Sequence, residues 1–323
     1  MGAEAQAKGG RLRTGAEALM LLCSPFNGQI LKSLDSAPLS LTDLRRAVGW
    51  PPQTTMRSHL RLLIKAGILE CRRRGGTPGA AEYELLPAGR QLNEVVDALQ
   101  AWLLASPDGP LEVGSTAGKS STKALAEGWS SGLVRALAAK PLTLTEVSQL
   151  INGLSYHSLD RRLTAMRLAG LIEPAPAPRR GTPYQVTDWL RQGIGPLAAA
   201  ARWERRNAAE RTSPIRPIDV EAAFLLALPL VQVGPEQSGT CRLLVDSPNG
   251  GSRRRAGVVV EVDDGRIASC VTRIEAEVDA SAVGSAAAWA RAVLARDPEG
   301  LEFSGRRPLA ISLSLGLHSA LVG

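Results

Sequence analysis

A segment beginning at Thr54 places hydroxyl and cationic side chains on one face of an expected helix. Met56, Leu60 and Leu63 follow an i, i+4, i+7 spacing, which is typical of a helix whose apolar stripe faces a core. The side chains expected to point outward are Thr54, Thr55, Arg57, Ser58, Arg61 and Lys65. Cations and hydroxyls without an acid can bind phosphate oxygens and the acceptor edge of guanine, so we expect double-stranded DNA as the partner. A face that served only solubility would usually mix both signs of charge.

The positive charge is concentrated in the part of the chain that contains this segment. Of the 323 residues, positions 1–211 hold 27 Lys and Arg against 18 Asp and Glu, while positions 212–323 hold 11 against 13. The whole chain has a net charge of +7. This asymmetry favours attraction of a polyanion by the first part and a different task for the second.

The first part contains an internal repeat. The segment 38–44 (PLSLTDL) recurs as 141–147 (PLTLTEV), and 66–69 (AGIL) recurs at the same offset of 103 as 169–172 (AGLI). Trp102 corresponds to Trp203 at an offset of 101. The repeat predicts two related domains at 17–104 and 124–208, joined by a Gly/Ser/Thr/Pro-rich linker at 105–123.

Each copy has the same expected order of elements. A helix precedes a capping-box signature, Ser40-x-x-Asp43 or Thr143-x-x-Glu146, which predicts the start of a second, short helix. A third helix carries the apolar stripe, and a β-hairpin and a final helix with Trp102 or Trp203 follow. A helix, a helix-turn-helix, a hairpin and a helix make up the winged-helix architecture. Two tandem winged helix-turn-helix domains are therefore expected.

The second copy and the two hairpin loops supply further candidate DNA contacts. On the third helix of copy two the outward residues are Tyr156, His157, Ser158, Arg161 and Arg162, together with Asp160, which would repel phosphate unless it accepts from cytosine. The loops, or wings, add Arg72, Arg73 and Arg74 in copy one and Arg179 and Arg180 in copy two. The alternative for copy two is a module for dimerisation or docking.

These segments resemble HxlR-type winged-helix regulators. Residues 153–163 (GLSYHSLDRRL), followed by 169–172, look like the recognition-helix block of that family, and Trp129 is similar to the tryptophan that opens its first helix. Residues 83–92 (YELLPAGRQL) resemble the segment that leaves the wing in HxlR-type and MarR-type regulators. The resemblance implies regulation of transcription, by repression or activation. Winged-helix proteins of this type generally bind DNA as dimers, so two copies in one chain could act as an intrachain pseudo-dimer, or the chain could form a homodimer.

The segment 219–323 has a different pattern of expected helices and strands, which predicts an α+β domain. An apolar helix near Val220 leads into β-like runs at 241–245, 257–262, 266–271 and 274–278. A helix around Trp289, a short β run at 301–303 and a C-terminal helix follow. The predicted fold class of the whole chain is thus mainly α with an α+β part.

This order of elements resembles the sterol-carrier-protein-like fold, although Arg306 stands where that pattern has an acid. The resemblance implies an apolar tunnel for a hydrophobic small-molecule effector. The side chains expected to line it are Phe224, Leu228, Val260, Trp289, Phe303, Leu313 and Leu317. An ordinary packed core is the alternative for each of these residues.

Other chemistry is not indicated. Residues 114–120 (GSTAGKS) lack the glycine spacing of a phosphate loop, and the three histidines and four cysteines are scattered without metal-ligand spacing. We therefore expect no cofactor, no metal, no membrane and no enzymatic activity, and a cytoplasmic location. The expected function is a ligand-responsive DNA-binding regulator. The alternatives are a small-molecule sequestration or resistance protein with vestigial winged helices, and a DNA-repair glycosylase built on tandem winged helices.

Overall fold

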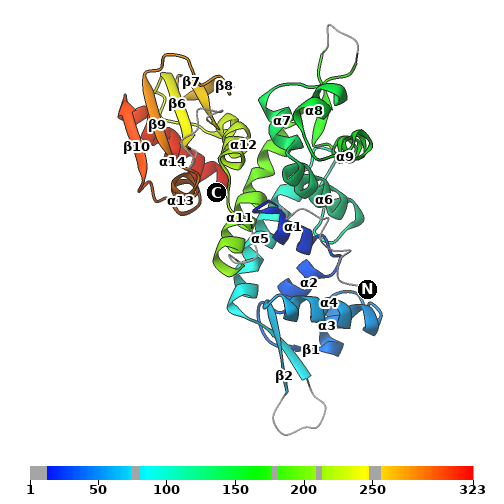
Figure 1. The fold of residues 1–323 in the computed structure, drawn as a ribbon. Coiled ribbons are helices and arrows are strands. Elements are labelled where there is room, and N and C mark those ends of the chain that lie inside the picture. Colours follow the sequence, from blue (N-terminus) through cyan, green and yellow to red (C-terminus); the bar gives the residue numbers. More distant parts are fainter. Residues whose placement is uncertain (1–12, 74–80, 177–180, 209–212, 247–255, 323) are drawn as a thin grey trace, which may run out of the picture.

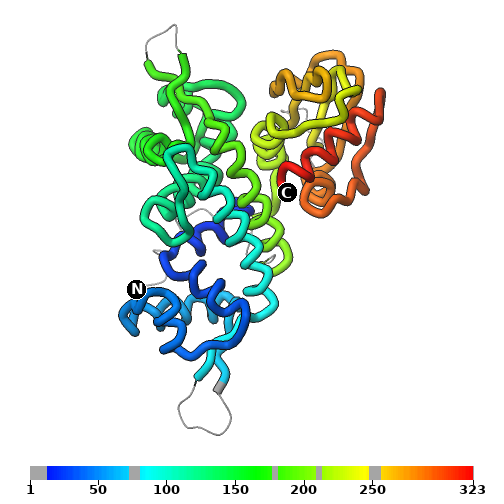
Figure 2. Tube along the Cα trace, turned by 180° about the vertical axis from the view of Figure 1, so that it is seen from behind, coloured from blue at the N-terminus to red at the C-terminus, as the bar shows by residue number. Residues whose placement is uncertain are grey.

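The computed structural model describes residues 13–73, 81–176, 181–208, 213–246 and 256–322. A column of helices runs from the hairpin strand β2 at one end to helix α8 near the other, and a sheet with flanking helices lies beside it (Figure 1). Seen from behind, the same two parts are distinct, and the C-terminus lies between them (Figure 2). None of the helices in the described ranges combines the length and the apolarity needed to cross a bilayer.

The first part of the column has the expected order of elements. Its elements are α1 (Ala16–Leu22), α2 (Asn27–Ser33), β1 (Leu39–Ser40), α3 (Leu41–Ala47), α4 (Gln53–Lys65), β2 (Leu69–Arg73), β3 (Ala81–Leu85) and α5 (Pro87–Leu104). Ser40 caps α3 by accepting a hydrogen bond from the Asp43 backbone N–H at 3.2 Å. The strands form one antiparallel sheet in the order β1-β3-β2. Met56, Leu60 and Leu63 are buried on the inner face of α4.

Residues 116–207 repeat these elements with small changes. They form α6 (Thr116–Ser131), α7 (Leu133–Ala139), α8 (Leu144–Leu150), α9 (Tyr156–Leu168), β4 (Ile172–Pro174), β5 (Tyr184–Val186), α10 (Asp188–Gln192) and α11 (Ile194–Asn207). Thr143 and Glu146 form the expected capping box of α8. The bridge between Leu142 and Tyr184 corresponds to the pairing of Leu39 with Tyr83 in the first sheet. The final helix, expected as one, is divided at Gly193 into α10 and α11.

The linker expected at 105–123 is shorter than the sequence indicated. Helix α6 begins at Thr116, and Ser115 caps it by accepting from the Gly118 N–H at 3.0 Å. Its small residues Gly118, Ser121 and Thr122 are buried, because α6 packs closely against α1. A composition typical of a linker here serves close helix packing instead.

Helix α5 joins the two parts through reciprocal tryptophan contacts with α10 and α11. The indole N–H of Trp102 donates to the carbonyl of Trp189 at 2.9 Å, and that of Trp203 donates to the carbonyl of Ala88 at 2.7 Å. Both donors and both acceptors are related by the offset of 101, so each part contributes the same pair of positions. Two hydrogen bonds of this interface are therefore reciprocal between the two parts.

A buried carboxylate lies beside this interface. Glu204 of α11 accepts from the backbone N–H groups of Gly15 and Ala18 at 2.7 and 2.8 Å, at the start of α1. Burial raises the pKa of Glu204 to about 7, although both hydrogen bonds act in the opposite direction. The carboxyl therefore binds its proton more tightly in the folded state than in the unfolded state.

Glu204→Gln is expected to flatten the dependence of stability on pH. A raised folded-state pKa gives stability that is present below the ordinary pKa of 4.5 and is lost as pH rises through about 7. Between pH 5 and 8, the unfolding free energy of the natural protein should fall relative to that of the glutamine variant by roughly 1–3 kcal/mol. Urea denaturation of both proteins over this range measures the difference. Parallel pH profiles would show that Glu204 titrates normally.

The C-terminal part is an α+β unit. It contains α12 (Pro217–Ala227), a 3-10 turn (Leu228–Leu230), β6 (Gly239–Asp246), β7 (Ala256–Asp263), β8 (Arg266–Val271), β9 (Ala280–Ser285), α13 (Ala286–Ala295), β10 (Leu301–Gly305) and α14 (Arg307–Val322). The sheet order is β10-β9-β6-β7-β8, and β6 pairs with β9 in parallel and with β7 antiparallel.

The strand expected at 274–278 is wrong. That segment is irregular, and the strand is the next one along the chain, β9 at Ala280–Ser285. Strand β9 is an interior strand, between β10 and β6, and is mostly buried. Small residues such as Ala280 and Ala282 suit that position because β10 and β6 flank them and α13 and α14 pack nearby.

Candidate functional site

Helix α4 presents the polar face that the sequence predicted. Its apolar stripe is buried, and Thr54, Arg57, Ser58, Arg61 and Lys65 are exposed, while Thr55 is half-buried. No acidic residue occurs in α4, and Arg57, Arg61 and Lys65 give the helix a positive charge. The arrangement can donate hydrogen bonds to phosphates and to the O6 and N7 atoms of guanine.

The turn before α4 adds residues that were not among the predicted DNA contacts. Trp50 is 52% exposed, and it adopts a left-handed backbone conformation with φ of 55°. The guanidinium groups of Arg45 and Arg46 lie 5.3 and 5.9 Å from its ring centroid, within the range of a cation–π interaction. Arg45 also donates to the carbonyl of Pro51 at 2.9 Å. The pair of arginines shortly before Gly-Trp-Pro-Pro was the feature of the sequence that could have indicated this surface. Arg45 and Arg46 extend the basic surface toward the start of α4.

The candidate wing residues divide into two groups. Arg72 is exposed, but it forms ion pairs with Glu70 and with Glu84, the latter at 2.8 Å. Glu70 and Glu84 therefore neutralise part of the charge of Arg72. Arg73 ends strand β2. Arg74, Arg179 and Arg180 lie outside the described residues.

Helix α9 presents a mixed face. Tyr156 is 56% exposed, and His157, Asp160 and Arg161 are exposed with it, whereas Ser158 and Arg162 are half-buried. The Ser158 backbone N–H donates to the capping Ser155 hydroxyl at 3.2 Å, so Ser158 belongs to the helix cap. The Nε atom of Arg162 is buried without a hydrogen-bond partner among the described residues. Arg161 is therefore the exposed arginine nearest the start of this helix face.

The residues expected to line an apolar tunnel do not lie together. Phe224, Trp289 and Leu317 share one apolar cavity. Leu228, Val260 and Leu313 are instead fully buried in the packed core, and Phe303 is half-buried on β10. These four residues do not line that cavity, so their place in a ligand tunnel stays a prediction.

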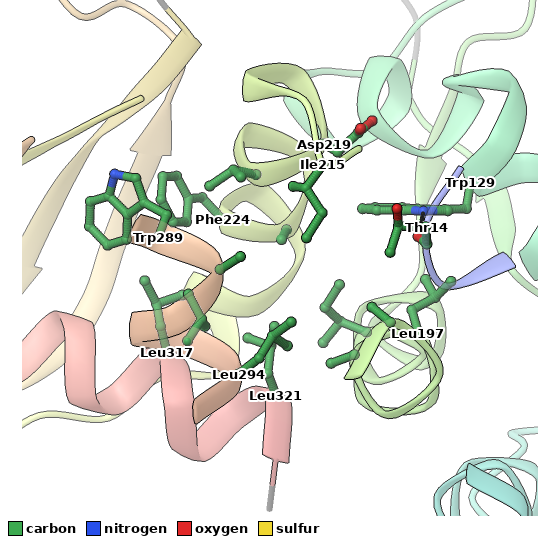
Figure 3. A pocket seen from close by; sticks show the side chains of 17 residues that line it. Thr14, Trp129, Leu197, Ile215, Asp219, Phe224, Trp289, Leu294, Leu317 and Leu321 are labelled. Atoms are coloured by element: carbon green, nitrogen blue, oxygen red, sulfur yellow. Dashed lines mark hydrogen bonds between the residues drawn. The ribbon is translucent and has the colours of Figure 1, made fainter. Parts of the chain in front are cut away.

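The observed cavity lies where the C-terminal unit meets the helical column. Phe224, Trp289, Leu294, Leu317 and Leu321 face it from one side (Figure 3). Trp129 of α6, Leu197 of α11 and Thr14 face it from the other side (Figure 3). The cavity measures about 70 Å³ and is almost wholly apolar, and Asp219 lies at its edge. The sequence could not indicate this site, because its walls come from segments up to about 300 residues apart.

Helix α12 is fixed to the column by arginine contacts beside this cavity. Arg135 of α7 donates to the Glu221 carboxylate at 2.5 and 3.0 Å, and the same carboxylate accepts from the Gly257 N–H at 3.0 Å. Arg191 of α10 donates to the Leu225 carbonyl at 2.9 Å. These contacts link the second helix set and the sheet through one helix, so a displacement of α12 would disturb both.

Three buried thiols are held in their protonated form. Burial raises the pKa values of the Cys23, Cys241 and Cys270 thiols to about 12, so they stay protonated near neutral pH. Within the described ranges, no group of three or more His, Cys, Asp or Glu side chains could hold a metal ion.

Comparison with known proteins assigns part of this architecture. The family model of the HxlR-like helix-turn-helix matches residues 21–107. A solution structure of a conserved hypothetical protein from Thermus thermophilus, described as possibly a sterol carrier protein, matches at 18% identity and a TM-score of 0.23. That match covers 28% of this chain and 74% of the other. No curated protein sequence matches the chain. The segment 21–107, which contains α4 and its basic face, is similar to the HxlR-like helix-turn-helix.

Proposed function

We propose that this protein is a DNA-binding transcription regulator whose principal reading element is α4. The observation that supports this most strongly is the coincidence of the HxlR-like match with an outward helix face that contains Arg57, Arg61 and Lys65 and no acid. An arginine at such a position can bind guanine bidentately, and a lysine can neutralise phosphate.

The second helix set is, in this proposal, a second winged helix, and the two domains extend over 17–104 and 124–208. Its support is the matching order of elements, the Leu142–Tyr184 bridge and the reciprocal contacts of Trp102 and Trp203. Helices α4 and α9 both lie on the side of the column away from the C-terminal unit (Figure 1). One chain would then act as its own pseudo-dimer on two half-sites.

Salt dependence of binding tests the proposal. Fluorescence anisotropy with duplex DNA from the protein's own upstream region should give an affinity that falls steeply between 50 and 200 mM salt. The decrease should be roughly tenfold or more, because bound Lys and Arg side chains release counterions. Absence of any salt-sensitive binding to this DNA would contradict the regulator.

The domain 219–323 is proposed to sense a hydrophobic small molecule at the junction cavity. At about 70 Å³ the cavity is smaller than the ~150 Å³ cavity that accepts benzene, so a ring system can enter only if α12 moves away from α11. A ligand that prefers this separated arrangement would alter the column and shift DNA affinity by its differential affinity for the two states.

Filling the cavity is expected to weaken binding of a hydrophobic probe. Ala223 lines the cavity from α12, so Ala223→Phe should occupy part of the space that a ligand needs. Titration with the uncharged dye N-phenyl-1-naphthylamine should give a saturable fluorescence increase that this variant weakens roughly tenfold, or about 1.4 kcal/mol. The matched control is Ala295→Phe on the exposed end of α13. Equal dye binding by all three proteins would contradict this ligand site.

A further inference from the structure

The two candidate reading helices occupy equivalent places in the repeat. Helix α4 and helix α9 each contain 13 residues, and their starts, Gln53 and Tyr156, differ by the repeat offset of 103. The buried positions keep their apolar character at this offset: Met56 corresponds to Leu159, and Leu60 corresponds to Leu163. Equivalent residues of the two helices therefore face the core, and the outward positions can be compared one by one.

Most of the outward positions differ, although Thr55 and Ser158 both carry a hydroxyl. Arg57 corresponds to Asp160, so the charge is reversed at a position that is exposed in both helices. At three further positions a charged side chain in one helix corresponds to an uncharged one in the other. Ser58 corresponds to Arg161, Arg61 to Thr164, and Lys65 to Leu168, which is 77% exposed. The two copies therefore share the buried residues that maintain the fold but differ in the exposed residues that would contact DNA bases.

Reversed charge at equivalent positions requires different bases. A guanidinium donates to the acceptors O6 and N7 of guanine, whereas a carboxylate accepts from the amino group of cytosine and repels phosphate. Two identical half-sites would match one helix and mismatch the other.

The chain itself fixes this pairing of unlike helices. The donors Trp102 and Trp203 and the acceptors Trp189 and Ala88 place the two helix sets about one pseudo-two-fold within a single chain. The two halves of this interface also differ in their ring contacts. Trp102 stacks on the Trp189 ring at a centroid distance of 4.5 Å, whereas Trp203 contacts Ala88, which has no aromatic ring. An ordinary two-fold dimer presents two copies of one helix, but this arrangement presents one copy of each.

We infer that the DNA partner is a non-palindromic duplex site, made of two dissimilar half-sites and bound in one orientation. This inference rests on the proposed DNA-binding function and adds the symmetry of the site to it. Helix α4 reads a half-site with guanines at the positions of Arg57 and Arg61, and helix α9 reads a different half-site through Asp160 and Arg161.

Selection from random duplex DNA by the full-length chain tests the inference. The expected result is an enriched motif whose two halves differ. An enriched palindrome would overturn the inference while leaving the regulator intact. Failure to bind any duplex in a salt-sensitive manner would overturn both, so the two failures are distinguishable.

A charge-converting variant gives a second, independent test. Asp160→Arg restores the α4 charge at the equivalent position of α9, so it should raise affinity at least tenfold for an inverted repeat of the α4 half-site and lower affinity for the selected site. The matched control is Glu275→Arg, the same charge change at an exposed position of the C-terminal unit. If Asp160→Arg changes the two affinities no more than the control does, α9 does not read DNA and the inference fails.

Discussion

Replacing Arg57 and Arg61 together by alanine is expected to reduce DNA affinity by roughly 100-fold or more. Both side chains are exposed on α4 and both extend from the face opposite its buried stripe. Each bidentate contact to a base contributes about 1–3 kcal/mol, and removing two cations also lowers the slope of affinity against salt by about 2. Anisotropy titrations at several salt concentrations measure both effects.

A charge-matched control separates reading from general electrostatics. Arg266 and Arg273 are exposed in the C-terminal unit, and the double variant Arg266→Ala/Arg273→Ala removes the same charge there. Its affinity should fall by less than about threefold, because screened charges more than a Debye length from the DNA contribute little. Equal losses in both double variants would mean that α4 has no special role. The circular dichroism spectra of all variants should match, since none of these side chains is buried.

Removing the ring of Trp102 is expected to cause the largest loss of stability among single substitutions at the α5–α11 interface. The Trp102 ring stacks on Trp189 at a centroid distance of 4.5 Å, and each indole N–H donates to the backbone carbonyl of the other residue at 2.9 Å. Trp102→Ala should lower the free energy of unfolding by about 3–5 kcal/mol, as for buried aromatic residues in general. Urea denaturation monitored by circular dichroism measures the change.

The conservative variant Trp102→Phe separates packing from hydrogen bonding. It keeps an apolar ring but leaves the Trp189 carbonyl without its indole donor, so the expected loss is only about 1–2 kcal/mol. This variant should remain folded and should bind DNA less tightly than the natural protein, because the two helix sets are less firmly positioned. A loss in Trp102→Ala no larger than in Trp102→Phe would contradict a structural role of the ring stack.

Local patterns in the sequence were sufficient to predict most elements of the column. The stripe of Met56, Leu60 and Leu63 and the capping signatures at Ser40 and Thr143 depend only on neighbouring residues. The same is true of the outward face of α4. For this reason the candidate DNA-binding residues of α4 lie on the surface as expected.

Features that depend on distant partners were not predicted. The start of α6 at Thr116 is stabilised by packing on α1, which overrides a composition typical of linkers. Strand β9 is a strand because its neighbours β6 and β10 provide hydrogen bonds, although its small residues have weak β propensity. The apolar cavity forms between Trp129 and Phe224, so no single segment indicates it.

The most direct test of the central claim is a hydroxyl-radical footprint of the full-length chain on its selected duplex, at a stoichiometry fixed by analytical ultracentrifugation. The account predicts one chain per duplex and two protected patches on one face of the DNA, about one helical turn apart. Arg57→Ala/Arg61→Ala should remove one patch, and Arg161→Ala should weaken only the other. A single protected patch, or two patches that require two chains, would contradict the intrachain pseudo-dimer.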